Sequence, residues 1–268
     1  MGDMAVKRLA LALCLLLAGC DFLSTRTPLD KRIGYGPVNH WWMNMGWVDA
    51  MAEEGVGIAH IEFLGRRSLG YYENPDPLFP HYRKLVRLTE MHGIQLFVSI
   101  ANDNKGLGKY GDDRRGLDQF EPQLRRAADF VLKNSPKGTW IQPVCEQRSA
   151  AGARLEEYVA RRWPKEHLVS NGNHGQPSGP APWARRFAFH QASARTPWPE
   201  GAVLVSDHSG ILREFFGGDW MGDARADPER VEEWARRGLE AGSIVVLYAW
   251  GQRTVDREAL RALSRAAR

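Results

Sequence analysis

Cysteine is scarce in this chain, and its positions exclude a fold held together by disulfides. Only three cysteines occur among 268 residues, and two of them, Cys14 and Cys20, fall in the first 20 residues. The rest of the chain carries Cys145 alone, so it can form no internal disulfide and must be stabilised by a hydrophobic core, which a chain of this length can bury. Because Cys145 lies in an apolar segment, we interpret it as a packing residue rather than a nucleophile.

Motifs that specify several other functions are also absent. The sequence contains neither a Gly-x-x-x-x-Gly-Lys-Ser/Thr phosphate loop nor a Gly-x-Ser-x-Gly nucleophile elbow. The formal net charge is +4, but lysine and arginine are interspersed with acidic residues and form no basic stripe. The sequence therefore predicts no cofactor and no nucleic acid partner, while mild basicity would favour contact with an anionic membrane or an acidic glycan.

The N-terminus carries a secretion signal. Lys7 and Arg8 precede the apolar segment 9–17, which is shorter than the roughly 20 residues of a membrane-spanning helix. The following Leu-Ala-Gly-Cys sequence resembles the bacterial lipobox, whose cysteine, here Cys20, is lipidated after cleavage. An uncleaved anchor or an ordinary secretory signal is the alternative.

The lipobox resemblance implies a division of the chain into three parts. Residues 1–19 would be a lipoprotein signal peptide, residues 20–31 a lipid-anchored tether, and residues 32–268 a single domain without a long linker. The protein would then be held at the cell membrane through lipid, and its domain would face the periplasm or the cell exterior.

Eight short apolar segments recur after the leader, most of them ending in polar or acidic residues. Helical patterns separate several of them, as in βα units that build a parallel sheet. Eight such units predict an α/β fold, a (β/α)8 TIM-like barrel, with an open α/β sheet as the alternative. The predicted strands are 33–39, 58–64, 95–102, 140–144, 167–171, 187–191, 203–207 and 244–250.

The connections between the predicted strands are uneven. The segments after the fifth and sixth strands are rich in glycine and proline, so we expect reduced helices at both places. The other connections carry amphipathic patterns, some of them closed by glycine. The predicted helices are 47–54, 80–92, 120–133, 156–162, 228–241 and 256–265.

Two carboxylates stand where a barrel places its chemistry, just after the carboxyl ends of strands. Glu146 follows the fourth predicted strand, and Asp207 ends the seventh. A carboxyl group at a barrel mouth can be partly desolvated, which raises its pKa and suits a general acid. Structural alternatives are an ion pair between Glu146 and Arg148 and a loop-capping role for Asp207.

This arrangement resembles the (β/α)8 glycoside hydrolases of the large retaining clan. Their acid/base glutamate follows strand four, their nucleophilic carboxylate follows strand seven, and a tryptophan often ends strand eight; Glu146, Asp207 and Trp250 match these places. The resemblance implies a retaining glycoside hydrolase acting on an envelope or extracellular glycan. Cys145 stands where the family usually has asparagine, and Asp207 replaces its usual glutamate.

Aromatic and amide side chains near other strand ends fit a glycan groove, because sugar rings stack on aromatic faces and amides bond to hydroxyl groups. His60 and Glu62 alternate on one strand, so we expect both to point into the barrel and to be satisfied internally. The candidate substrate-binding residues are Trp41, Trp42, Tyr71, Asn102, Asn171, His190, Trp220 and Trp250.

Two other functions fit parts of the same pattern. The domain could be a non-catalytic glycan-binding or envelope scaffold that kept the barrel and lost the chemistry. It could also be a metal-dependent barrel hydrolase, although no His-x-His or His-Glu-x-x-His motif is present, and we predict no metal. The candidate ligands in that case are His60, Glu62, Asp103, Glu146, His174, His190, Asp207 and His208.

Overall fold

A computed structural model describes most of the domain but not the leader. The described residues are 27–37, 41–65, 69–102, 117–145, 149–171, 180–190, 203–207, 227–249 and 255–268, with side chains except at 69, 189–190, 203–207 and 249. The predicted signal peptide and Cys20 therefore lie outside the described residues. Among the helices that are described, none is long and apolar enough to cross a membrane.

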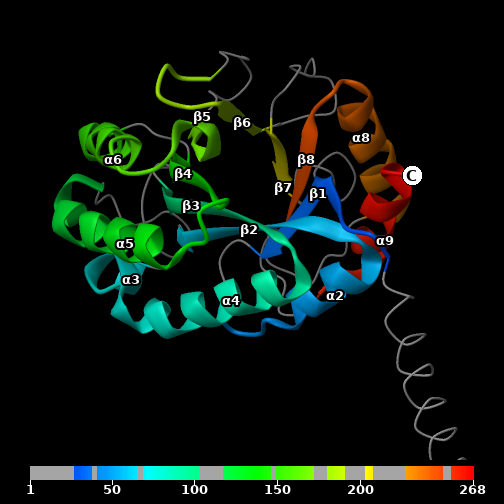
Figure 1. Cartoon of the computed structure of the whole chain (residues 1–268), viewed down its shortest axis with the longest axis horizontal. Helices are drawn as coiled ribbons and strands as arrows, with labels where there is room; N and C mark the ends of the chain where they lie inside the picture. Colours follow the sequence, from blue (N-terminus) through cyan, green and yellow to red (C-terminus); the bar gives the residue numbers. More distant parts are fainter. Residues whose placement is uncertain are drawn as a thin grey trace, which may run out of the picture.

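The described strands form one parallel sheet in the order β4-β3-β2-β1-β8-β7-β6-β5. Its two edge strands meet where Ile141 of β4 forms a parallel bridge with Leu168, just before β5, so the sheet closes into a ring. The predicted TIM-like barrel is thereby confirmed (Figure 1). The strands are β1 (Asp30–Pro37), β2 (Val56–Leu64), β3 (Gln95–Asn102), β4 (Trp140–Cys145), β5 (Val169–Asn171), β6 (Arg186–His190), β7 (Val203–Asp207) and β8 (Ile244–Ala249).

Helices surround the ring of strands on its outside (Figure 1). They cover β1 to β4 and β8, and their buried faces supply most of the hydrophobic core between helices and sheet. The helices are α2 (Gly46–Glu54), α3 (Leu69–Glu73), α4 (Phe79–His92), α5 (Glu121–Asn134), α6 (Ala150–Ala160), α8 (Pro228–Glu240) and α9 (Arg257–Ala266), with short 3-10 turns η1 (Asp76–Leu78), η3 (Leu117–Phe120) and η4 (Lys165–His167).

Local chemistry accounts for several helix ends. Gly55 and Gly93 end α2 and α4 with φ angles of 78° and 71°, a left-handed conformation that glycine adopts without steric cost. Asp227 caps α8 and Asp256 caps α9, each through its side-chain oxygen. Between β5 and β6 the described residues 180–185 form turns rather than a helix, as the glycine and proline content predicted.

Two predicted boundaries differ from the structure by three residues or more. β1 begins at Asp30, three residues before the predicted strand, because its first residues are polar and exposed: Asp30 binds the Arg32 guanidinium at 2.6 Å. Helix α6 begins at Ala150, six residues before the predicted helix. Its first turns are rich in alanine and glycine and show little apolar periodicity, but the Ser149 hydroxyl caps them by accepting a hydrogen bond from Gly152 N at 3.0 Å.

Candidate active site

The carboxyl ends of the strands gather the predicted polar residues on one rim of the barrel. Asn102 ends β3, Asn171 ends β5, His190 ends β6 and Asp207 ends β7. All strands run parallel, so these residues belong to the same rim, where barrels of this kind build their active sites. We call it the carboxyl rim.

The two candidate catalytic carboxylates differ in how far the structure describes them. Asp207 closes β7, and its Cα lies in register with Tyr248 of β8. Glu146 lies outside the described residues, but it directly follows Cys145, the buried last residue of β4, which pairs in register with Asn102. Three strand steps separate β4 from β7 around the closed ring.

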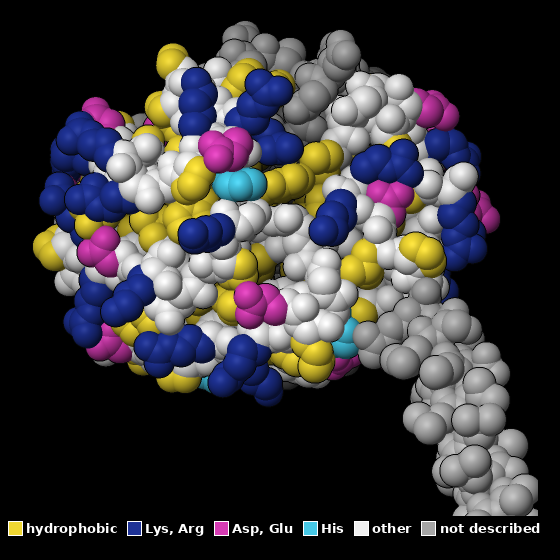
Figure 2. Space-filling view, in the orientation of Figure 1, with side chains coloured by type: hydrophobic (Ala, Val, Ile, Leu, Met, Phe, Trp, Pro, Cys, Tyr) yellow, Lys and Arg dark blue, Asp and Glu magenta, His cyan; other side chains and the backbone are white. Residues whose placement is uncertain are grey.

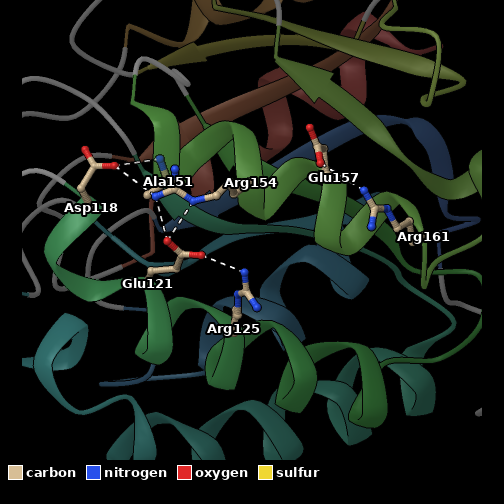
Figure 3. A network of polar contacts seen from close by, with 7 residues as sticks. All are labelled: Asp118, Glu121, Arg125, Ala151, Arg154, Glu157 and Arg161. Atoms are coloured by element: carbon tan, nitrogen blue, oxygen red, sulfur yellow. Dashed lines mark hydrogen bonds and ion pairs between the residues drawn. The ribbon is translucent and has the colours of Figure 1, made fainter.

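The described residues on both sides of Glu146 are bonded to neighbouring elements. Upstream, Cys145 lies within β4; downstream, Asp118 Oδ1 accepts a hydrogen bond from Ala151 N at 3.0 Å in the first turn of α6. Glu121 then joins α5 to α6 through Arg154 at 2.7 Å, and Arg125 adds a second ion pair to Glu121 at 2.8 Å (Figure 3). These contacts fix the ends of the short β4–α6 connection that carries Glu146.

The interior of the barrel below the rim is apolar. Ile58, Phe97, Trp140, Val246 and residues of β5 and β6 form a separate buried cluster from the one under the helices. Their positions follow from strand alternation, which sends every second side chain of β2, β3, β4 and β8 inward. We call this cluster the apolar floor; the polar residues of the barrel interior lie between it and the carboxyl rim.

A buried carboxylate lies above that floor. Glu62 of β2 is only 1% exposed, and its Oε1 accepts hydrogen bonds from Asn102 Nδ2 at 2.9 Å and from the Tyr248 hydroxyl at 3.0 Å. Asn102 pairs in register with Cys145, the residue before Glu146, and Tyr248 pairs in register with Asp207 itself. Glu62 therefore connects the β4 side of the rim with the β7 side.

A second polar chain crosses the same level of the barrel. His60 Nε2 lies 3.0 Å from the Ser99 hydroxyl, which donates to Gln142 Oε1 at 2.6 Å. The His60 ring stacks on Phe97 of the apolar floor, with ring centroids 4.1 Å apart. As expected, both side chains are buried and hydrogen-bonded within the barrel, His60 through Nε2 and Glu62 through Oε1.

The aromatic candidates separate into core and surface residues. Trp41 is fully buried against Phe63 and Tyr82, so in this structure its indole packs in the core rather than lining a groove. Trp42 and Tyr71 are partly exposed, and their rings meet edge to face with centroids 5.1 Å apart. They follow β1 and β2, which places this pair beside the carboxyl rim.

The remaining candidates have no described side chain or no described position. The His190 and Asp207 side chains are not described, and Trp220 and Trp250 lie outside the described residues, as do Asp103, His174 and His208. Among the residues that are described, no three acidic, histidine or cysteine side chains lie close enough together to hold a metal ion.

Sequence reasoning missed two residues of the polar layer. Tyr248 and Gln142 both lie on strands predicted as apolar segments, and both are buried. Strand alternation could have identified them: Tyr248 is two residues from the inward Val246, and Gln142 is two residues from the inward Trp140.

Similarity to known proteins lies in structure rather than in sequence. No protein-family model and no curated protein matches the chain. A β-glucanase from Saccharophagus degradans superimposes with a TM-score of 0.54 at 11% identity, covering 87% of each chain. A GH5 family lichenase from Caldicellulosiruptor sp. F32 gives 0.53 at 10% identity, over 89% of this chain and 94% of that one.

A third match has the same character. The endo-1,4-β-D-mannanase from Thermotoga petrophila RKU-1 gives a TM-score of 0.53 at 9% identity, over 87% of this chain and 99% of that one. At such identities the matches establish the fold alone. The chain is similar to glycoside hydrolases in being a (β/α)8 barrel of nearly the same extent.

Proposed function

We propose that this protein is a retaining glycoside hydrolase, tethered to the cell membrane by lipid on Cys20, that acts on an envelope or extracellular glycan. The observation that carries the proposal is the position of Glu146 and Asp207 in the strand order, directly after β4 and at the end of β7. The barrel fold and its similarity to enzymes named as a lichenase and a mannanase support it.

The proposed reaction has two steps. In the first, an Asp207 oxygen attacks the anomeric carbon, the glycosidic C–O bond breaks, and Glu146 gives its proton to the departing oxygen. In the second, Glu146 takes a proton from water, whose oxygen attacks the same carbon and releases Asp207. Two inversions retain the configuration of the sugar.

The polar layer has a supporting role in this proposal. Glu62 binds the Asn102 amide, whose register partner Cys145 precedes Glu146, and the hydroxyl of Tyr248, which is the register partner of Asp207. Such buried, mutually bonded groups pre-organise a site, because their orientation is set before the substrate arrives. Trp42 and Tyr71 would form an aromatic wall for a sugar ring at the β1–β2 side.

A paired-variant assay tests the activity. The full chain is incubated with lichenan, β-mannan and xylan, and reducing ends are measured for the wild type, Glu146→Gln and the matched control Glu157→Gln. Glu157 lies exposed on α6 in an ion pair with Arg161. We expect turnover by the wild type and by Glu157→Gln, and its loss with retained glycan affinity in Glu146→Gln.

The other outcomes decide between the remaining functions. If the wild type binds glycan but does not hydrolyse it, the protein is a non-catalytic binding scaffold and the hydrolase proposal is wrong. Activity that a chelator abolishes would indicate the metal-dependent alternative. Incorporation of labelled palmitate into the wild type, but not into Cys20→Ser, would establish the tether independently of any activity.

A further inference from the structure

The amino-terminal rim of the barrel, opposite the carboxyl rim, carries a cluster of basic residues. They lie just before β4, β5 and β6 or, in one case, at the first position of β6. We call this cluster the basic rim and define it as Lys137, Arg162, Lys165, Arg185 and Arg186. Figure 2 shows lysine and arginine side chains over β5 and β6, with acidic and histidine surface among them.

Direct contacts join the three connections into one surface. The Trp163 indole donates to Thr139 O at 3.0 Å, which links the segment before β5 to the turn before β4. Arg186 donates to Glu166 O at 2.9 Å, and its guanidinium lies over the Trp140 ring, 4.5 Å from the centroid. The basic rim is therefore a defined surface rather than a set of separate side chains.

The charges of the basic rim are not balanced by the described residues. None of its five residues forms an ion pair with a described carboxylate, and Glu166 is the acidic residue among them. Several arginines on the outer helices are paired, as Arg154 is with Glu121 and Arg265 with Glu232. Burial lowers the pKa of Arg186, and the neighbouring Arg185 lowers it further.

Tryptophan accompanies these charges. Trp163 and Trp183 are partly exposed and lie in the same connections as Arg162, Lys165 and Arg185. Indole rings beside lysine and arginine are typical of surfaces that meet the headgroup region of a lipid bilayer, where the ring is amphipathic and the cation pairs with phosphate.

The path of the chain brings the N-terminus to the same rim. A β-carbon on Gly55, before β2, would lie 2.6 Å from Thr27, and one on Gly93, before β3, would lie 3.8 Å from Leu29. Residues 27–29 thus run along the amino-terminal rim. Seven residue steps separate Thr27 from Cys20, which limits their separation to about 25 Å.

We propose that the basic rim docks on anionic lipid headgroups, so that the amino-terminal rim faces the membrane and the carboxyl rim faces away from it toward the glycan. The proposal rests on the proposed tether for proximity and adds an orientation to it. Lysine and arginine near an anionic surface each strengthen attachment by about fivefold. The carboxylate site would then be open to polymers that a membrane-facing site could not admit.

Hydrogen exchange on vesicles tests this orientation. The full chain is reconstituted through its own N-terminus into vesicles of phosphatidylcholine, with or without phosphatidylglycerol. We expect slower exchange in peptides that contain Lys137, Lys165 and Arg185 only on the anionic vesicles, and no change in α9. The protection should weaken as salt rises.

A matched pair of double variants isolates the role of charge. Lys165→Glu with Arg185→Glu should abolish the protection on anionic vesicles. Lys84→Glu with Arg87→Glu makes the same charge change on exposed α4 and should leave it intact. Equal protection on neutral vesicles, or none on either kind, would overturn the proposal.

Two further comparisons distinguish lipid docking from binding of an acidic glycan and from the proposed hydrolase activity and tether. Protection of the basic rim by soluble polygalacturonate but not by vesicles would assign it to an acidic glycan and overturn lipid docking. The exchange measurement requires no turnover, and palmitate labelling reports the tether separately. Its failure is therefore distinguishable from failure of the hydrolase assay or of palmitate labelling.

Discussion

Two layers of the barrel interior, built by the same strands, have opposite chemistry. Ile58 and Phe97 are apolar and fully buried, whereas His60, Glu62 and Ser99, a few residues further along β2 and β3, are polar and equally buried. Burying a carboxylate and satisfying it with hydrogen bonds gains little stability compared with well-packed hydrocarbon. The apolar layer therefore contributes most of the stability of the barrel interior. The polar layer lies toward the carboxyl rim, where the proposed active site is.

The largest expected effect is a loss of activity on substitution at the carboxyl rim, without the loss of stability expected for the apolar layer. Replacing Asp207 by Asn removes the proposed nucleophile while keeping the shape of the side chain, so we expect turnover to fall about 1,000-fold or more. The melting temperature should stay within a few degrees of the wild-type value. Steady-state rates and thermal unfolding, measured on the same samples, check both parts; undiminished turnover would remove Asp207 from the mechanism.

The anomeric configuration of the first product tests the assignment of Asp207 as the nucleophile. With Asp207 as nucleophile, the sugar keeps its anomeric configuration, because two displacements occur at one carbon. Proton NMR recorded during the first minutes of hydrolysis should therefore show the anomer of the substrate before mutarotation. Appearance of the opposite anomer would show that Asp207 acts as a base that activates water and not as a nucleophile.

The apolar layer should respond in stability. Ile58→Ala opens a cavity among Phe97, Trp140 and Val246, and we expect the free energy of unfolding to fall by about 2–5 kcal/mol. Ile58→Val, which removes one methylene, should cost about 0.5–1.5 kcal/mol. Urea denaturation measures both. A loss in Ile58→Ala no larger than in Ile58→Val would show that the interior repacks.

The polar layer should respond in the opposite way. In Glu62→Gln the side-chain oxygen can still accept from Asn102 and Tyr248, so stability should change by no more than about 1 kcal/mol. Replacing the carboxyl group by an amide should lower kcat about tenfold, with KM nearly unchanged, and shift the pH profile of kcat. Because Glu62 would act through other residues, a fall in stability with a normal pH profile would mean a structural role only.

Most of the fold could be predicted because a parallel barrel repeats one simple pattern. Each strand is a short apolar segment with a polar end, which is how Asn102 and Asp207 were assigned to the rim. Trp41 could not be assigned from the sequence, since a tryptophan after a strand can face the core or a groove. Strand alternation places Tyr248 inside the barrel but gives no sign of its partner Glu62. Those outcomes depend on packing between strands distant in sequence.

The smallest expected effect concerns the outer surface, where charge is balanced, and it depends on pH. The Arg154 guanidinium lowers the pKa of Glu121, and Arg265 with Arg236 lowers that of Glu232, both from a usual value of 4.5. A carboxylate with a lowered pKa in the folded state contributes its stability fully above its usual pKa and loses it as pH falls through the lowered value.

Both groups are exposed, so solvent screening keeps this contribution small. The urea midpoint should fall gently below about pH 4.5. Glu121→Gln combined with Glu232→Gln should flatten that slope without changing activity at neutral pH, because both side chains lie on outer helices away from the barrel interior. An unchanged slope in this double variant would show that the acid sensitivity arises from groups other than these two ion-paired carboxylates.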